Sequence, residues 1–202
     1  FNQFFDDRNG TDTWHYGIGL DHRATTVLAG IEFSMRDLEV PNKDTTTGVV
    51  FSRAWSEQQG RAYLYWNIGP KFIATAEYLY ELAKRPEDLT TDGILNLRTH
   101  RVPLGLGFFH PSGITWNMRA TYLNQTGSFI DTTSNPNIYS EGKEQVWLID
   151  TEAGYRLPKR YGFLAIGVKN IFDTAFKFQD TDPANPSFVL NRFVYGRMNL
   201  SF

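Results

Sequence analysis

The most informative absences in this chain are cysteine and long apolar runs. None of the 202 residues is cysteine, which fits an exported protein without disulfides and fits many cytosolic proteins equally well. No run of about 18 apolar residues occurs, so a membrane-spanning helix is excluded. A membrane-spanning strand is still allowed, because it needs only about 9 to 11 residues of alternating character and leaves the mean hydropathy low. The value of -0.38 fits such a chain.

The chain also lacks a basic cluster and a leader sequence. Its net charge is -2, which argues against nucleic acid as a partner. The opening residues, FNQFFDD, have neither the basic start nor the apolar core of a signal peptide. We therefore expect a chain that begins after processing or that is the C-terminal part of a longer protein. Its length allows one domain, residues 1–202.

What the chain has throughout is alternation with a period of two, which is typical of β-strands. In its last fifteen residues, FVLNRFVYGRMNLSF, one parity is largely apolar and the other carries most of the polar groups. The same pattern predicts eight earlier strands, and the opening six residues would be the remnant of a tenth. The nine strands are expected at residues 14–21, 27–36, 61–68, 72–81, 101–108, 114–122, 147–155, 164–169 and 188–202.

Two kinds of connection alternate between these strands. Tight ones are expected at residues 23–26, 69–71, 110–113 and 157–161, and long polar ones at 7–13, 38–48, 84–93, 131–143 and 179–187. Short turns on one rim and long loops on the other are typical of outer-membrane barrels. The pattern predicts an all-β, antiparallel up-and-down transmembrane barrel with about ten strands visible, and a larger barrel of which this is a part is the open alternative.

A soluble antiparallel sandwich would alternate too. It would need no aromatic belts, whereas the apolar parity here carries aromatics at both strand ends, as expected at two membrane interfaces. Trp66, Trp116 and Phe202 lie near the short turns, and Trp14 and Trp147 lie toward the long loops. These aromatics favour the barrel over the sandwich.

Three features fit the pattern less simply. Pro103 lies inside a strand and predicts a bulge, because proline cannot donate a ladder hydrogen bond. Arg192 falls on the lipid-facing parity, where its height predicts a side chain that reaches the far interface. Residues 49–60 are too long for one span, so we expect a hairpin arm that rises above the membrane.

The inward parity carries charged side chains at about mid-height on successive strands. Neighbouring strands mostly offer opposite signs, so one interpretation is an ion-pair network that fills a narrow barrel. The other interpretation is a charged constriction that orients a polar solute or ion in a water-filled pore. The candidate residues of this charged belt are Glu32, Arg61, Glu77, Arg101, Arg119, Asp150, Glu152, Lys169 and Arg197.

Enzyme and metal chemistry find little support in the sequence. Asp150 and Glu152 share a face, but cations on adjacent strands should keep both ionised, which suits ion pairing better than acid–base catalysis. The four histidines lack metal-ligand spacing, and Ser187 and Ser201 have no histidine and aspartate placed around them. The acidic stretch at residues 179–185 is interpreted as a solvated loop rather than a calcium site. We expect no catalytic residue, cofactor or metal.

The C-terminal motifs carry a family resemblance. VKNIFDT at residues 168–174, followed by Gly196, Arg197 and a terminal aromatic, resembles the end of TonB-dependent receptor barrels, where an NLFD-type strand precedes a last strand ending in Phe. Leu200 and Phe202 resemble the C-terminal signal read by the barrel-assembly machinery. RTHRVPLGLGFFHPSG also resembles barrels appended to periplasmic tetratricopeptide-repeat domains of export systems. The plug and roughly 22 strands of a complete receptor do not fit in this chain.

These patterns predict a barrel in the outer membrane of a Gram-negative bacterium that serves the passage or export of a polar solute or polymer. Its expected partners are the lipid bilayer and the barrel-assembly machinery. One alternative is a non-conducting barrel that anchors or docks a periplasmic or surface protein. A fragment of a TonB-dependent receptor barrel is another.

Overall fold

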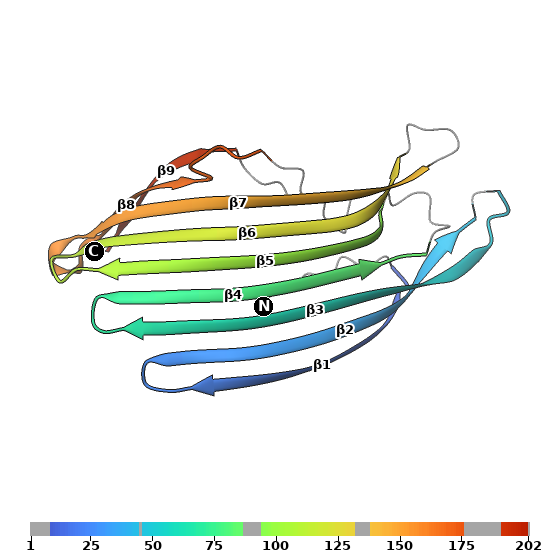
Figure 1. The fold of residues 1–202 in the computed structure, drawn as a ribbon, viewed down its shortest axis with the longest axis horizontal. Coiled ribbons are helices and arrows are strands. Elements are labelled where there is room, and N and C mark those ends of the chain that lie inside the picture. The colour runs from blue at the N-terminus through green and yellow to red at the C-terminus, as the bar shows by residue number, and fades with distance from the viewer. Residues whose placement is uncertain (1–8, 45, 87–93, 132–137, 176–190, 202) are drawn as a thin grey trace.

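A computed structural model of the protein describes residues 9–44, 46–86, 94–131, 138–175 and 191–201. Within them the chain forms one antiparallel up-and-down sheet whose nine strands lie side by side in sequence order (Figure 1). The predicted all-β chain and its nine strands are confirmed. The strands are β1 (Asp12–Arg23), β2 (Val27–Lys43), β3 (Val50–Ile68), β4 (Phe72–Lys84), β5 (Ile94–Phe109), β6 (Ile114–Asp131), β7 (Ile138–Arg156), β8 (Gly162–Lys169) and β9 (Phe193–Leu200).

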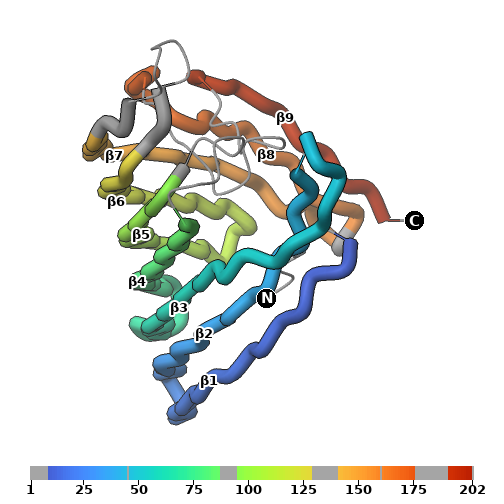
Figure 2. The backbone as a smooth tube through the Cα atoms, turned by 90° about the vertical axis from the view of Figure 1, so that its right-hand side faces the viewer, coloured from blue at the N-terminus to red at the C-terminus, as the bar shows by residue number. Residues whose placement is uncertain are grey.

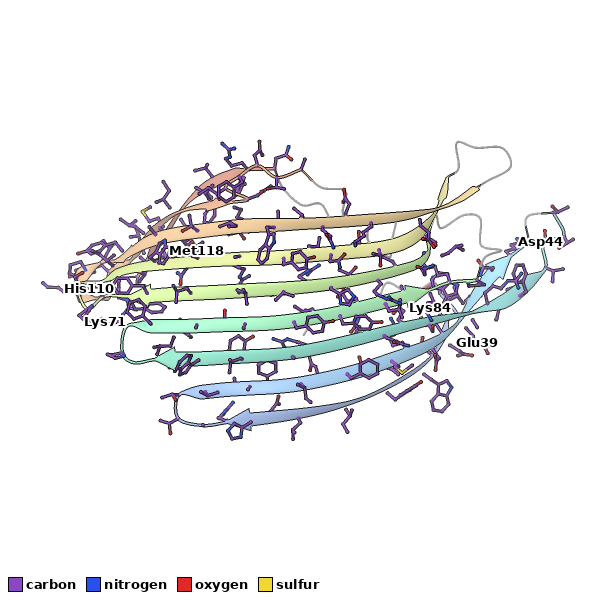
Figure 3. All side chains as sticks on the ribbon, in the orientation of Figure 1. Glu39, Asp44, Lys71, Lys84, His110 and Met118 are labelled. Carbon is purple, nitrogen blue, oxygen red and sulfur yellow. The ribbon has the colours of Figure 1, made fainter. Side chains whose placement is uncertain are left out.

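The two ends of the sheet differ in their connections. At one end, where Figure 3 labels Lys71 and His110, three to five residues join β1 to β2, β3 to β4, β5 to β6 and β7 to β8. A short 3-10 helix, η1 (Pro158–Arg160), forms the last of these turns. We call this end the short-turn rim. The opposite end, where Figure 3 labels Asp44 and Lys84, is the long-loop rim.

The pairing register fixes which side chains share a face. Each of the eight strand pairs keeps one register, with a single irregularity between Ile94 and Asn96 at the start of β5. Because side chains alternate across a strand, this register gathers one parity of every strand on one side of the sheet. We call the side with Glu32 and Arg119 the concave face and the side with Leu104 the convex face.

The sheet is strongly curved (Figure 2), and its core lies inside the curve. The buried strand side chains of the described residues lie on the concave face, with Leu82 as the exception. Leu38 and Val40 are the most deeply buried, with exposures of 2% and 1%. The convex face leaves large apolar side chains open, and Trp14 and Ile18 are each 80% exposed. This sheet therefore presents apolar surface on the side that a soluble protein would normally cover.

Several strands are longer than the alternation predicted. β2 continues to Lys43 and β3 begins at Val50, so much of the loop expected at residues 38–48 is a paired ribbon. β6 and β7 likewise extend into the loop expected at residues 131–143. The backbone ladder continues beyond the residues that show the apolar alternation, because strand pairing depends on main-chain hydrogen bonds and not on which face is apolar.

The β2–β3 hairpin ends in a turn organised by Asp44. Its Oδ1 accepts hydrogen bonds from the backbone N–H groups of Thr46 at 2.7 Å and Thr47 at 3.2 Å. These bonds favour the ionised carboxylate and hold the pKa of Asp44 below its usual range. Gly48 has a φ of 71°, a conformation that favours glycine. The arm expected at residues 49–60 is thus one side of a hairpin, and its position relative to a membrane stays a prediction.

The bulge expected at Pro103 is wrong. On the β4 side, Leu104 pairs with Ala76 and Arg101 pairs with Leu79, so the register is the same on both sides of the proline. Only the ladder between these two pairs is interrupted. Proline costs a local hydrogen bond here without adding a residue to the strand.

The expected place of Arg192 on a strand face is also wrong. β9 begins at Phe193, and Arg192 lies in the bend before it, where its backbone N–H donates to Asp173 Oδ1 at 2.7 Å. Other expectations fall outside the described residues, namely those for residues 1–6, residues 179–187 with Ser187, residues 188–190 and Phe202.

β8 ends in a turn built around Asn170, inside the VKNIFDT motif. The Asn170 side chain is buried, and it bonds both backbone groups of Thr174, donating to the carbonyl at 3.0 Å and accepting from the N–H at 2.9 Å. The backbone N–H of Asn170 donates to Oδ1 of Asp150 on β7 at 2.8 Å. Asn170 has a φ of 48°, which asparagine tolerates better than most residues. The motif therefore ends β8 and ties it to β7.

Replacing Asn170 with alanine should lower the stability of the sheet. Asn170→Ala removes both hydrogen bonds to Thr174 and leaves two partly buried backbone groups without their partner, so we expect a loss of about 1–3 kcal/mol in the free energy of unfolding. Urea unfolding followed by tryptophan fluorescence measures it. Asn96→Ala, on an exposed position of β5, is the matched control and should change stability by less than about 0.5 kcal/mol. Equal stabilities of the two variants would contradict the role given to Asn170.

Candidate functional site

The charged belt lies on the concave face, spread over the eight strands from β2 to β9. Its members do not share one cross-strand row. Glu32 and Arg61 are direct partners in one row, whereas Arg119 and Asp150 are partners two concave rows closer to the short-turn rim. The belt therefore crosses the sheet as a diagonal, as expected when strands are tilted relative to the axis of a curved sheet.

Arg61 is the centre of the first cluster within the belt. Its guanidinium lies 3.0 Å from Glu77 Oε2 on β4 and 3.7 Å from Glu32 Oε1 on β2. The Tyr65 hydroxyl accepts a hydrogen bond from Arg61 at 3.0 Å and donates to Glu77 Oε1 at 2.7 Å. Arg61 and Glu77 are about a quarter exposed, so water screens their attraction only in part. Two carboxylates and one phenol thus hold one guanidinium across three strands.

Glu152 is the centre of the second cluster. Arg197 NH2 on β9 donates to both carboxylate oxygens of Glu152, at 2.9 and 3.2 Å. The Tyr195 hydroxyl adds a third hydrogen bond to Oε2 at 3.0 Å. This cluster reaches from β7 over β8 to β9, and it repeats the arrangement of the first: an ion pair completed by a tyrosine on the concave face.

The remaining belt residues do not extend these clusters into one network. Arg119 and Lys169 are exposed, and neither bonds a described residue. Asp150 stands opposite Arg119 in the register, but its Oδ1 accepts the backbone N–H of Asn170 instead. Arg101 is half-buried on β5. The belt therefore combines two paired clusters with two cations that are open to solvent.

A hollow of ≈ 540 Å³ opens on the concave face over β1 to β4. Glu32 and Arg61 of the first cluster line it, together with Glu81, Ser34 and Gln59. Its lining combines these polar side chains with apolar groups such as Leu79 and Phe33. An arrangement of this kind can hold hydrated polar groups, and it contains no nucleophile and base in mutual contact.

Sequence reasoning missed a buried group at the long-loop end of the concave face. We call it the upper cluster, and it comprises Leu38, Val40, Leu97, Thr99, Leu123, Gln125 and Val146. Beside it, Arg36 NH1 lies 2.8 Å from Glu57 Oε2, and Gln125 donates to Thr99 at 3.2 Å. A signal for it was present, because the concave parity carries Leu38 and Val40 toward the end of β2 and Leu97 near the start of β5. It was overlooked because the parity was expected to keep one polarity along the whole strand.

The convex face changes polarity along the same strands. One row of six register partners is entirely apolar: Ala29, Leu64, Ala76, Leu104, Ala120 and Ile149. The row four same-face positions closer to the long-loop rim is entirely polar: Asp37, Ser56, Lys84, Asn96, Ser128 and Glu141. Near the long-loop rim the convex face is therefore polar, whereas the concave face combines the aliphatic side chains of the upper cluster with charged ones such as Arg36 and Glu57. In the lower part of the sheet the convex face is apolar and the concave face carries the charged belt.

The expected interface aromatics lie on the convex face at the two ends of its apolar region. Trp66 and Trp116 are near the short-turn rim, and the Trp116 indole donates to Thr151 at 2.9 Å. Trp14 and Trp147 are toward the long-loop rim and are at least half exposed. Leu200 of the expected assembly signal is the last residue of β9, at the short-turn rim.

Other classes of site find no counterpart in the described part of the chain. No helix there is long and apolar enough to cross a membrane, and no three His, Asp or Glu side chains gather as they would around a metal ion. Comparisons of the chain with protein-family models, with curated proteins and with solved structures found no match. The geometry of the two faces is therefore what bears on function.

Removing the guanidinium at the centre of the first cluster should destabilise the sheet. Arg61→Ala leaves Glu32 and Glu77 facing each other without a cation, so we expect a loss of about 1–2 kcal/mol, between the values for exposed and buried ion pairs. The midpoint of urea unfolding at neutral pH measures it. Arg119→Ala, which removes an exposed arginine of the same belt with no bonded partner among the described residues, should cost less than about 0.5 kcal/mol. If both variants lose the same stability, the first cluster is not a stabilising unit.

Proposed function

We propose that this sheet is part of the wall of an outer-membrane β-barrel whose concave face lines a passage for a polar solute or polymer. The observation that carries the proposal is the polarity change on the convex face. On six neighbouring strands, β2 to β7, one convex row is apolar and another is polar. The two rows are separated by the same number of residues on every strand. A change of surroundings from hydrocarbon to water accounts for such a boundary.

The height of the apolar region fits a bilayer. On β4 the convex positions are apolar or aromatic from Phe72 to Leu82, and Lys84 follows. These eleven residues rise about 33 Å along the strand, at ~3.3 Å per residue. A strand tilt of ~40° reduces this to about 25 Å, the height of the lipid-facing band of outer-membrane barrels.

A soluble sandwich explains the convex face less well. It would need a second sheet over residues such as Ile18, Leu104 and Ile166, which are 42% to 80% exposed. It would also need that second layer to leave the polar row open to water on all six strands. Lipid supplies both conditions without a further layer.

The concave face supports a passage for something polar. In a closed barrel its charged belt would line the lumen, where hydration and ion pairing keep charges stable. Arg119 and Lys169 are exposed and have no bonded partner among the described residues, so they are available to a solute. The two paired clusters would position fixed charges around them.

Placing a charge in the middle of the convex apolar row should prevent stable insertion. Leu104→Arg puts a guanidinium near the proposed bilayer midplane, so we expect a loss of about 2–4 kcal/mol in the free energy of folding into lipid vesicles. Gln145→Arg is the matched control, because it adds the same group to the convex face of β7 near the long-loop rim. It should change that free energy by less than about 1 kcal/mol. Equal tolerance of both arginines would contradict the membrane assignment.

The second candidate is a non-conducting barrel that anchors or docks a periplasmic or surface protein. The upper cluster favours it, because aliphatic side chains at 1% to 7% exposure on the concave face leave that end of the lumen without a hydrated lining. Aliphatic constrictions of this kind exclude water and ions.

Single-channel recording of the full-length protein in a planar bilayer separates the two candidates. A passage gives discrete conductance steps, and Arg119→Ala shifts their ion selectivity toward cations because it removes an exposed positive charge from the lumen. Lys84→Ala, on the convex polar row, serves as the control and should leave selectivity unchanged. Complete absence of steps from protein that is inserted in the bilayer would favour the anchor.

The proposed location is the outer membrane of a Gram-negative bacterium, with insertion by the barrel-assembly machinery through Leu200 and Phe202. A fragment of a TonB-dependent receptor barrel is a third candidate. The observation that favours it is the Asn170 turn, which gives the VKNIFDT motif a structural role at the end of β8. No catalytic role is proposed.

A further inference from the structure

The two outer strands of the sheet run in the same direction. β1 runs toward the short-turn rim, where a tight turn leads into β2. β9 also runs toward this rim, where Ser201 donates a hydrogen bond to the carbonyl of Tyr161 in the β7–β8 turn. Within the described residues, β1 pairs with β2 alone and β9 with β8 alone, and both free edges lie on the same side in Figure 2.

This shared direction limits how the edges can be closed. Every neighbouring pair in the sheet is antiparallel, and bacterial single-chain barrels of this type have an even number of strands. If β1 bonded to β9 directly, that pair would be parallel, with a weaker ladder than the others. One further strand, or any odd number of them, lets each junction be antiparallel.

The glycines of the concave face indicate what the strand beside β1 carries. At three of them, an aromatic ring of the next strand occupies the place of the missing side chain: Tyr63 over Gly30, Phe163 over Gly154 and Tyr195 over Gly167. A methyl group at Gly30, for example, would lie 2.7 Å from ring carbons of Tyr63. An aromatic side chain over a glycine is thus a repeated unit of this sheet.

Gly17 and Gly19 of β1 lack such a cover on the described side. A methyl group at Gly17 would meet the backbone and side chain of β2, and one at Gly19 would have Glu32 Cβ as its nearest neighbour, at an ordinary 3.5 Å. None of the three nearest atoms at either glycine belongs to an aromatic ring. Both belong to the concave face of the edge strand, beside the free ladder.

From these two observations we infer that an odd number of further strands of the same polypeptide joins the free edges of β1 and β9. The strand next to β1 precedes it in sequence, runs antiparallel to it, and places an aromatic side chain over Gly19. A strand of the same polypeptide is the occupant because each described strand pairs with its neighbours in sequence. The inference rests on the proposed barrel.

Cysteine pairs in the full-length protein, folded in the membrane, test the edges. Ile18→Cys on β1 is combined in turn with a cysteine at each convex position of β9, namely Val194, Gly196, Met198 and Leu200. If a strand intervenes, the two cysteines are at least two strand spacings apart, about 10 Å, which is too far for a disulfide. We expect no disulfide from any pair, and bridging by bifunctional maleimides of about 10 Å or longer.

Two control pairs calibrate this measurement inside the described sheet. Ile31→Cys with Ala62→Cys joins register partners on adjacent strands and should form a disulfide. Leu20→Cys and Ala62→Cys lie in the same cross-strand row with β2 between them, so this pair should be bridged only by the maleimide. A disulfide between Ile18→Cys and any β9 cysteine would overturn the inference, as would crosslinking into a dimer, which would assign the edge to a second copy.

A glycine substitution tests the aromatic cover. Gly19→Ala fits the described sheet, because its methyl group has Glu32 Cβ at 3.5 Å as its nearest neighbour, so it should reduce the folded fraction several-fold only if a side chain of the further strand lies over it. Gly196→Ala on the convex face of β9 is the control and should fold like the wild type, since its methyl group has the carbonyl oxygen of Ala165 at 4.0 Å as its nearest neighbour. Wild-type folding of Gly19→Ala would overturn this part of the inference. The lipid-insertion test with Leu104→Arg is independent of the edges, so failure of the barrel and failure of the edge assignment are distinguishable.

Discussion

The continuous pairing of neighbouring strands is the constraint on which every other property of this protein depends. Side chains alternate with a period of two, so a slip of one residue in any pair would exchange the faces of all strands beyond it. The convex apolar row, the diagonal charged belt and the upper cluster all exist because eight strand pairs keep their register together. In the proposed membrane barrel the same ladder would have a second role, because it would satisfy backbone groups that lipid cannot bond.

The convex face changes from apolar to polar along six of the long strands. Toward the short-turn rim the concave face carries the charged belt, and toward the long-loop rim it carries the upper cluster beside the Arg36–Glu57 ion pair. Arg61 and Leu38 lie on the same face, yet one is held by carboxylates and a phenol while the other is almost fully buried. The belt and the upper cluster are therefore two parts of one concave surface. If the concave face lines a passage, its conduction depends on whether the belt or the upper cluster forms the narrower constriction.

The sequence was sufficient for the nine strands and their faces, because a period of two survives even where strand ends are uncertain. It was insufficient wherever a main-chain contact decided the outcome. Strands such as β3 continue as paired backbone beyond their apolar positions, and Arg192 was assigned to a strand whose first residue is Phe193. Arg119 lies on the strand next to Asp150 as expected and is its register partner, but Asp150 Oδ1 accepts the backbone N–H of Asn170 instead. The upper cluster was missed because one polarity per face was assumed.

The order of the strands in space also has a consequence for how the molecule forms. Every described strand pairs with its neighbours in sequence, so each hairpin requires the closure of only a short or moderate stretch of chain. Such local contacts form quickly, and a sheet can grow by adding one strand at a time. Joining the two outermost edges, which the proposed barrel requires, would be different, because it brings together segments separated by most of the chain. That closure would be the slow, entropically costly event, and until it happened two unpaired edges would be open to other strands.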